Sequence, residues 1–225
     1  MERIAVQTNV LKANQEAAIE IRRAFEQEGL LVINLMSGPG AGKTSLLEVT
    51  IKALQAQYHI AVIEGDLQTD LDAERIRALD ARAFQINTGT MCHLDARMIA
   101  RALQEFPLKG VDLLVIENVG NLICPAAYDL GESLRVVLCS VAEGPEKPKK
   151  YPVMFHKADV ILLNKTDLGL PSGEDQLELE KNVKDVNPRA KVFAISCRTG
   201  AGLAAWTEWL TNAVATHKLK QLTAQ

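Results

Sequence analysis

A glycine-rich segment with the sequence Gly-Pro-Gly-Ala-Gly-Lys-Thr occupies residues 38–44 and follows a short apolar run. In phosphate-binding loops of this kind, backbone N–H groups surround phosphate oxygens, and a Gly-Lys-Thr ending opens a helix whose N-terminus also attracts phosphate. Ser37 stands where the pattern has its first glycine, yet Gly38 and Gly40 still allow the backbone to curl. Because the Gly-Lys-Thr ending is intact, a phosphate loop is favoured over a glycine-rich turn without a ligand.

The residues of this loop have separate expected roles in binding and hydrolysing a nucleoside triphosphate. Lys43 brings a positive charge to the β- and γ-phosphates and so takes part in catalysis, and Thr44 offers a hydroxyl ligand to Mg²⁺. Further contacts to the phosphates are expected from the backbone of the loop and the first helical turn: Gly38, Gly40, Ala41, Gly42 and Ser45.

A second motif, Asn-Lys-Thr-Asp, begins at Asn164 and follows another apolar run. The carboxylate of Asp167 can accept the N1–H and the 2-amino group of guanine, two donors that adenine lacks on that edge. Lys165 is expected to lie along the base and ribose. The backbone of Ser196 and Cys197, after the last apolar run, resembles the guanine-binding segment that approaches the base oxygen. In this order behind a phosphate loop, the motifs predict GTP rather than ATP.

Acidic residues end two other apolar runs, where parallel strands place ligand-binding side chains. Asp66 is a candidate to bind Mg²⁺ through water or to orient the attacking water. Asp70 and Asp72 are alternatives, although a solvated helix start explains both. Glu117 and Gly120 resemble a Walker B/switch II segment, and Glu117 is expected near Mg²⁺ and the γ-phosphate. No catalytic glutamine or in-cis arginine finger is evident in the sequence, so hydrolysis is expected to be slow.

Two cysteines and one histidine form a candidate metal site. Cys92 and His93 are adjacent in "TGTMCHLD", and Cys124 lies seven residues after Glu117. If the loops meet, two thiolates and one imidazole suit Zn²⁺ or Ni²⁺. Thr90 is expected to cap a helix whose first turn holds Cys92 and His93, which would lower the pKa of the thiol.

Spacing alone leaves two interpretations of this cluster open. Neighbouring helical residues point in different directions, so one chain is expected to have difficulty chelating a single ion with both Cys92 and His93. A two-fold dimer would complete such a site with ligands from both chains. In the alternative, Cys92 and Cys124 are small buried hydrophobes and His93 caps a helix. Cys139, inside "VVLCSV", is predicted to be a core residue.

Short apolar runs alternate with segments of helical periodicity along the chain. The apolar runs occupy residues 30–36, 59–64, 82–86, 111–118, 134–141, 159–163 and 191–195. The helical segments occupy residues 10–29, 44–57, 70–79, 93–105, 175–186 and 202–215. The alternation predicts an α/β fold, a doubly wound and mostly parallel sheet of about seven strands with helices on both faces.

The chain, residues 1–225, is predicted to be a single P-loop GTPase domain with residues 1–29 as an N-terminal helical appendage, and residues 143–152 are predicted to form a polar loop. A formal net charge of −3 gives no electrostatic reason to expect nucleic acid. No apolar run reaches the length that spans a bilayer, and the first residues do not resemble a secretion signal. A cytoplasmic protein with reduced thiols is therefore expected.

Taken in order, the motifs resemble those of one family. They are Gly-Pro-Gly-Ala-Gly-Lys-Thr, Glu-Gly-Asp-Leu, Thr-Gly-x-x-Cys-His-Leu-Asp, Glu-Asn-Val-Gly-Asn-Leu-x-Cys-Pro and Asn-Lys-Thr-Asp. This pattern is similar to that of the HypB family of hydrogenase nickel-incorporation proteins, GTPases of the deviant P-loop (SIMIBI) class. The resemblance extends from about residue 30 to residue 215. The "CHLD" and "ENVGNLICP" segments distinguish it from the related urease accessory GTPase, whose metal motif is Cys-Pro-His.

The resemblance implies a metallochaperone that helps to deliver nickel to [NiFe]-hydrogenase, dimerises with GTP bound and hydrolyses GTP slowly. By position it implies that Cys92, His93 and Cys124 bind metal at the dimer interface. It also implies two protein partners, the small nickel-binding protein HypA and the hydrogenase large subunit. Some members carry an N-terminal Cys-rich motif or a histidine-rich tract. This sequence has neither Cys nor His before His59, so high-capacity nickel storage is not expected.

Two other classes of function agree with parts of the sequence. The first is a GTPase accessory protein for another metalloenzyme or a cobalamin enzyme, in which the cysteines are structural. The second is an ATP-using kinase with a P-loop, which the Asn-Lys-Thr-Asp motif disfavours.

Overall fold

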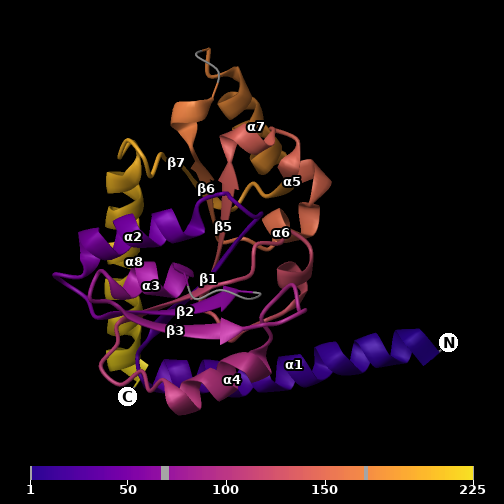
Figure 1. Cartoon of the computed structure of the whole chain (residues 1–225), viewed down its shortest axis with the longest axis vertical. Helices are drawn as coiled ribbons and strands as arrows, with labels where there is room; N and C mark the ends of the chain where they lie inside the picture. The colour runs from indigo at the N-terminus through magenta and orange to yellow at the C-terminus, as the bar shows by residue number, and fades with distance from the viewer. Residues whose placement is uncertain (1, 67–70, 170–171, 225) are drawn as a thin grey trace.

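The computed structural model describes residues 2–66, 71–169 and 172–224. Within them lies one sheet of seven strands in the order β3-β2-β4-β1-β5-β6-β7, and every pair of neighbours is parallel (Figure 1). The strands are β1 (Leu31–Ser37), β2 (Ile60–Asp66), β3 (Arg82–Asn87), β4 (Leu113–Glu117), β5 (Leu134–Ser140), β6 (Val160–Asn164) and β7 (Lys191–Ala194). The seven predicted strands are confirmed.

The helices and 3-10 turns connect these strands. The α-helices are α1 (Glu2–Gln27), α2 (Lys43–Leu54), α3 (Leu71–Arg77), α4 (Ala96–Glu105), α5 (Lys147–Lys150), α6 (Pro152–His156), α7 (Glu174–Val186) and α8 (Leu203–Ala224). The 3-10 turns are η1 (Cys124–Ala127), η2 (Val141–Glu143) and η3 (Thr166–Leu168). The prediction of a loop at 143–152 is wrong, because η2, α5 and the start of α6 occupy that segment. Both α1 and α8 extend beyond the predicted helices, toward the N- and C-terminus respectively.

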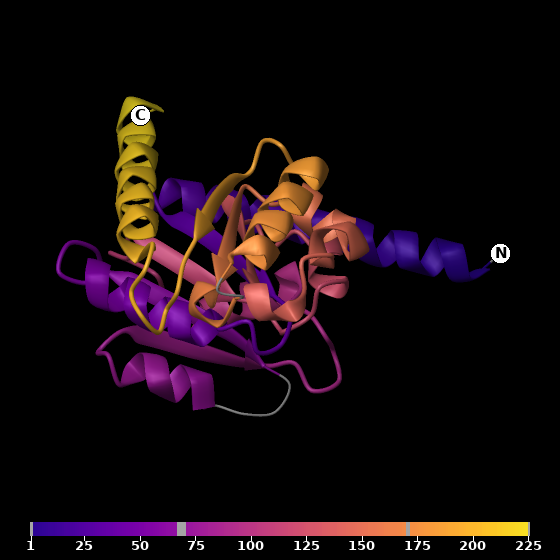
Figure 2. The ribbon, with the colours of Figure 1, turned by 90° about the horizontal axis from the view of Figure 1, so that it is seen from above.

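Helices cover both faces of the sheet, which explains why the central strands are apolar along their whole length. On one face, α2 and α8 pack side chains such as Ile51 and Leu210 against β1 and β4. On the other face, α1 and α4 cover the β2–β4–β1 half with Phe25 and Ile99. The remaining half of that face lies under α6 and α7, where Phe155 is fully buried. Figure 2 shows the same arrangement from above, with α8 at one end of the sheet.

Only part of α1 lies against this core. Ala18, Ile21 and Phe25 are buried, and α1 runs beside α4 (Figure 1). The N-terminal part of α1 projects past the edge of the sheet formed by the carboxyl ends of β2 and β3. The second half of the expected appendage is therefore integral to the core. Among the described residues, no helix combines the length and apolar character needed to cross a lipid bilayer.

Candidate nucleotide and metal sites

The phosphate loop lies at the point where the strand order reverses. β1 is flanked by β4 and β5, and the chain leaves its carboxyl end through the loop into α2, which is where doubly wound sheets bind ligands. Gly42 precedes α2 with a φ of 104°, and a Cβ there would lie 2.7 Å from Nδ2 of Asn164. Only glycine suits both the backbone conformation and this close approach.

Lys43, Thr44 and Glu117 meet behind this loop, as their motifs predict. The Thr44 hydroxyl donates a hydrogen bond of 3.3 Å to Oε1 of Glu117. Nζ of Lys43 lies 3.7 Å from the same oxygen and donates to Oγ of Ser37 at 3.4 Å. The serine that replaces the first glycine of the motif therefore contacts the phosphate-binding lysine.

Sequence reasoning missed Glu64, which lies opposite Glu117 in the register of β2 and β4. Both side chains are buried, with 2% and 4% of the residue exposed. Burial and the neighbouring Glu117 raise the pKa of Glu64 to about 10. Burial also raises the pKa of Glu117, although Lys43 opposes that shift. The signal was a single glutamate in an otherwise apolar strand, because a carboxyl group is seldom buried without a functional or paired role.

The acidic pair fits a divalent cation. Oε1 of Glu64 and Oε2 of Glu117 are buried and have no hydrogen-bond partner among the described residues. Hard cations such as Mg²⁺ take oxygen ligands of this kind together with a P-loop hydroxyl, here that of Thr44. Asp66 ends β2, and its carbonyl oxygen accepts the Thr88 N–H at 2.8 Å.

The two alternatives to Asp66 have different outcomes. Asp72 lies in the first turn of α3 and pairs with Arg75 at 3.3 Å. This arrangement agrees with the solvated helix start that was considered for it. Asp70 lies outside the described residues.

All the predicted guanine-binding residues except Ser196 line one cavity of about 420 Å³ between α2 and the loops after β6 and β7. Asn164 connects the phosphate loop to the loop after β7. Its Nδ2 donates to the Ala41 carbonyl at 2.9 Å, and its Oδ1 accepts the Cys197 N–H at 3.2 Å. Nζ of Lys165 donates to the Gly40 carbonyl at 2.7 Å. The motifs at 38–44, 164–167 and 195–200 are thus brought together.

Asp167 is already held in place in the cavity. It accepts a short hydrogen bond from the Ser196 hydroxyl and one of 2.7 Å from Nε of Arg198. The Ser196 hydrogen bond, followed by that of Arg198, lowers the pKa of Asp167, so its carboxylate is ionised and able to accept donors. Sequence reasoning assigned no role to Arg198, which lies next to the predicted Ser196 and Cys197.

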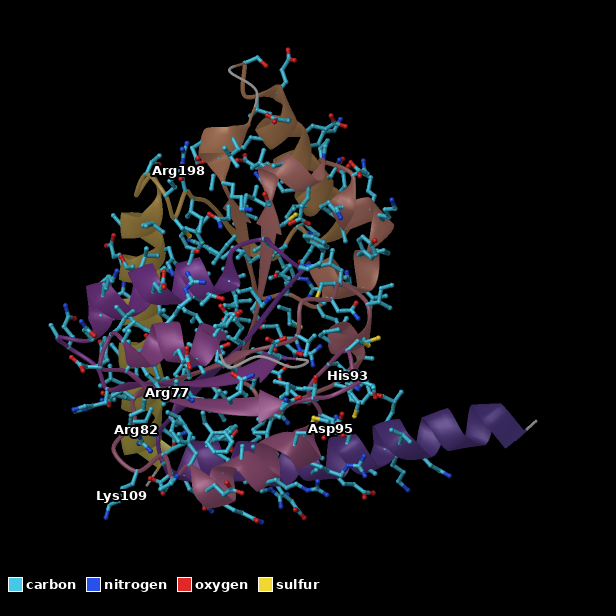
Figure 3. All side chains as sticks on the ribbon, in the orientation of Figure 1. Arg77, Arg82, His93, Asp95, Lys109 and Arg198 are labelled. Atoms are coloured by element: carbon cyan, nitrogen blue, oxygen red, sulfur yellow. The ribbon has the colours of Figure 1, made fainter. Side chains whose placement is uncertain are left out.

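The three predicted metal ligands converge within a single chain. One ligand atom each from Cys92, His93 and Cys124 can be chosen so that all lie within 4.8 Å of one another. Sγ of Cys92 is 3.9 Å from Nδ1 of His93. Figure 3 places His93 and Asp95 near the carboxyl end of the sheet beside α4, far from Arg198 at the base cavity. The cluster and the guanine pocket thus lie in different parts of the molecule.

Two predictions about this segment are wrong. The helix begins at Ala96, because Asp95 is its N-cap and accepts the Met98 N–H at 2.8 Å. Cys92 and His93 therefore lie in the loop that precedes the helix and not in its first turn. The expected difficulty of chelation also disappears, since loop residues are free of the helical spacing that separates neighbouring side chains.

The protonation of the cluster follows from its surroundings. Burial lowers the pKa of His93, which keeps the imidazole neutral and its lone pair available near pH 7. The ring stacks on Tyr128 with a centroid separation of 3.9 Å. A hydrogen bond with Cys92, followed by burial, raises the pKa of Cys124. That thiol is protonated without metal, so metal binding must release a proton.

Asparagines connect the loops that carry these ligands. Asn118 accepts the Leu94 N–H at 3.1 Å through Oδ1, and Nδ2 of Asn121 donates to the Cys92 carbonyl at 3.4 Å. Both asparagines lie between Glu117 and Cys124, in the segment that links the phosphate site to the metal cluster. Both belong to the "ENVGNLICP" motif, but the sequence alone predicts no role for them.

Comparison with known proteins agrees with this geometry. Residues 31–194 match the family model described as the CobW/HypB/UreG nucleotide-binding domain. The hydrogenase maturation factor HypB of Azotobacter chroococcum is 50% identical over 210 residues, which cover 92% of this chain and 68% of that protein. The probable hydrogenase maturation factor HypB of Methanocaldococcus jannaschii is 40% identical, with 92% of this chain and 93% of that protein covered. The chain belongs to the HypB family.

Solved structures of HypB proteins share the fold. That of Archaeoglobus fulgidus HypB has a TM-score of 0.84 at 40% identity and covers 90% of this chain and 99% of its own. That of Helicobacter pylori HypB, described as a complex with nickel, has a TM-score of 0.82 at 37% identity and covers 92% of this chain and 97% of its own. The predicted family and fold class are thereby confirmed.

Proposed function

We propose that this HypB family member is a GTP-hydrolysing metallochaperone that binds nickel and assists its insertion into [NiFe]-hydrogenase during maturation. The observation that carries the proposal is the convergence of Cys92, His93 and Cys124 on the loops next to a nucleotide site. Two thiols and a neutral imidazole form a donor set that accepts Ni²⁺ or Zn²⁺. The nickel complex of the H. pylori relative supports nickel as the cargo.

GTP and GDP bind in this proposal through the residues of the two nucleotide motifs. Asp167 accepts the donors of guanine, and Lys43 contacts the phosphates. Thr44, Glu117 and Asp66 would hold Mg²⁺, which would neutralise charge on the transferred phosphoryl group. The oxygens of Glu64 and Glu117 that have no hydrogen-bond partner in the described part of the chain support such a site. Hydrolysis is slow, because positioning and charge stabilisation without an arginine finger give modest rates.

The loop from Glu117 to Cys124 couples the nucleotide to the metal. It begins with a carboxylate that contacts Thr44 and ends with a thiol of the metal cluster. Loss of the γ-phosphate releases contacts at one end of the loop, and the metal ligand at the other end moves in response. Such a link gives GTP hydrolysis a direct effect on metal release.

Three ligands leave at least one coordination position open for Zn²⁺ or Ni²⁺. In this proposal a homodimer, formed with GTP bound, places two such clusters at a shared interface and supplies the remaining ligands. The same open position suits transfer, since a ligand from the nickel-binding protein HypA or from the hydrogenase large subunit can enter there. These partners follow from membership of the HypB family.

The test measures metal content and oligomeric state together, with GDP and with a non-hydrolysable GTP analogue. Cys124→Ala is expected to keep nucleotide affinity and to lose most bound nickel and zinc, because it removes one of three ligands. Cys139→Ala is the matched control, since that thiol is buried in the core and is not one of the three grouped ligands. It is expected to retain metal.

Unchanged metal stoichiometry in Cys124→Ala would overturn the assignment of the metal site. Absence of bound nickel and zinc from the native protein with either nucleotide would favour the alternative, a GTPase accessory to another metalloenzyme or to a cobalamin enzyme. A metal content that does not depend on nucleotide would contradict the proposed coupling.

A further inference from the structure

Asn14, near the middle of α1, contacts both segments that carry the metal ligands. Its side chain is buried, with 3% of the residue exposed. Nδ2 donates to the Asp129 carbonyl at 2.9 Å, and Oδ1 accepts the Ala96 N–H at 2.8 Å. Ala96 follows His93 by three residues, and Asp129 follows Cys124 by five. One amide therefore spans from the first metal loop to the second.

The chemistry of this contact requires an amide. The Ala96 N–H is the first of α4 and has no acceptor within its own helix, so Asn14 satisfies it from outside. The Asp129 carbonyl needs a donor in the opposite direction. A carboxylate offers no donor, and an apolar side chain would leave both buried groups unpaired. Asparagine makes both bonds at once.

Other contacts extend this connection to the ligands themselves. Arg22 of α1 holds the Asp129 carboxylate with two hydrogen bonds of 2.6 and 2.8 Å. Tyr128, the residue before Asp129, stacks on the His93 ring. The position of α1 thus fixes the backbone that carries the stacking partner of a metal ligand, as well as the loop that carries the ligand.

Attachment of α1 to the body does not need Asn14. Ala18, Ile21 and Phe25 already bury the following turns of the helix in the core, and Arg22 adds an ion pair. Asn14 lies toward the projecting end, beyond these anchors. Burying an amide gains little stability compared with burying an apolar side chain. The specific result of the two hydrogen bonds is the spacing of the two metal loops.

We propose that Asn14 is a positioning residue of the metal site. It sets the separation of the Cys92–His93 loop from the Cys124 loop, and through it α1 becomes part of the scaffold that determines metal affinity and geometry. The inference rests on the proposed function, since it concerns the metal held by Cys92, His93 and Cys124. Outer partners of this kind orient the ligands and tune the bound ion.

The test titrates Ni²⁺ and Zn²⁺ against a chromophoric chelator and records the absorption spectrum of the Co²⁺-loaded protein. Asn14→Ala is expected to weaken metal binding by about tenfold or more and to change the ligand-field bands of Co²⁺, while affinity for a fluorescent guanine nucleotide stays the same. Asn14→Asp keeps the acceptor for Ala96 but loses the donor to Asp129, so it is expected to fall between Asn14→Ala and the native protein.

Phe25→Leu is the matched control, because it loosens the packing of the same helix about 16 Å along the axis from Asn14 and removes no hydrogen bond to either metal loop. It is expected to lower the thermal midpoint while leaving metal affinity and the Co²⁺ spectrum unchanged. Equal loss of metal affinity in Phe25→Leu would overturn the inference, since Asn14 would then act only through helix attachment. If Asn14→Ala fails to fold, Asn14→Asp carries the comparison.

The role of Asn14 and the metal site itself can be disproved separately. Native metal affinity and an unchanged Co²⁺ spectrum in Asn14→Ala, with loss of metal in Cys124→Ala, would overturn the role of Asn14 alone. Equal metal binding by Cys124→Ala and the native protein would overturn the metal site itself and, with it, this inference.

Discussion

Glu64 and Glu117 occupy neighbouring strands where water hardly reaches them, and Lys43 is the nearby cation. Two ionised carboxylates on neighbouring buried strands repel each other, so Glu64 keeps its proton. A bound divalent cation would displace this proton, because it stabilises the ionised carboxylates of both Glu64 and Glu117. The site is thus arranged to be stable without metal and receptive to it.

Glu64→Gln tests this protonation through stability. Glu64 has an ordinary pKa of 4.5 when unfolded and holds its proton to about pH 10 when folded. The native state binds more protons between these values, so the free energy of unfolding falls as pH rises across that window. Glutamine cannot titrate and still offers a donor to Glu117. The variant is therefore expected to raise the thermal midpoint of the nucleotide-free protein by several degrees at about pH 8.5 and by less at about pH 5.5.

Differential scanning calorimetry at the two pH values measures the effect. Glu178→Gln, at an exposed position in α7, is the control and is expected to change little at either pH. An increase for Glu64→Gln of equal size at both pH values would contradict the assignment of the proton.

Asp167→Asn tests nucleotide specificity. The amide cannot accept both donors of guanine, whereas xanthine presents an oxygen to which it can donate. Affinity for GTP is expected to fall at least about a hundredfold, with preference moving to xanthosine triphosphate. Competition against a fluorescent nucleotide measures both affinities. Asp185→Asn, on the surface of α7, serves as the control. Retained preference for GTP would show that Asp167 does not determine base recognition.

At the level of residues, the nucleotide-binding side chains could be predicted from their motifs, whereas the conformation of the loop around Cys92 could not. Asp167 and Lys43 are assigned by spacing, because their ligand dictates their positions. The helix start near Cys92 was predicted wrongly because two residues compete to cap it. Thr90 precedes the apolar pattern, but Asp95 makes the capping bond, and tertiary contact with Asn14 supports that later start.

The segment after β4 lies directly against the phosphate loop. A Cβ at Gly120 would lie 3.0 Å from Cα of Pro39, which is a backbone contact that no side-chain rotation can relieve. A shift of the segment after β4 toward the phosphate loop would therefore push on its backbone. This contact gives the proposed coupling a mechanical basis that does not depend on a bound phosphate.

Gly120→Ala is expected to force these loops apart. Overpacking of this type costs about 1–3 kcal/mol, which corresponds to a loss of affinity of about 5- to 150-fold when it falls on the bound state. Nucleotide affinity should fall accordingly, while metal affinity without nucleotide changes less. Titration with a fluorescent GTP analogue and with Ni²⁺ separates the two effects. Unaltered nucleotide binding would show that the loops adjust at no cost.

Some helices and strands have a clear hydrophobic pattern in the sequence, whereas others form only because of their tertiary packing. The strands were predicted because continuous apolar runs suit a parallel sheet buried on both faces. The helices α5 and α6 were missed because each is a single turn. Pro148 and Pro152 favour a loop in the sequence pattern, yet proline is well tolerated in the first turn of a helix, where both lie. The packing of α6 around Phe155 is a tertiary effect.

At the scale of the whole molecule, the parallel sheet places every functional loop at one edge. The base cavity lies on the β6–β7 side, the phosphate loop at the centre and the metal cluster toward β2 and β3. The order of sites along the edge follows the strand order, and the family could be predicted because its motifs occur at these strand ends. The contribution of α1 could not, since helical periodicity carries no information about which loops a helix joins.

The two ends of the described chain lie far apart, with the start of α1 beyond the metal edge and the end of α8 at the opposite side (Figures 1 and 2). A histidine tag fused at the N-terminus would begin on the side of Cys92 and Cys124, where its imidazoles can occupy open coordination positions.

The same tag at the C-terminus would begin remote from them. We expect the N-terminally tagged protein to show tighter apparent nickel binding and a weaker effect of Cys124→Ala, as measured by chelator competition before and after tag cleavage. Identical results for both placements would contradict this. The position of a purification tag therefore decides whether its imidazoles can act together with Cys92 and Cys124 or only as a separate nickel site.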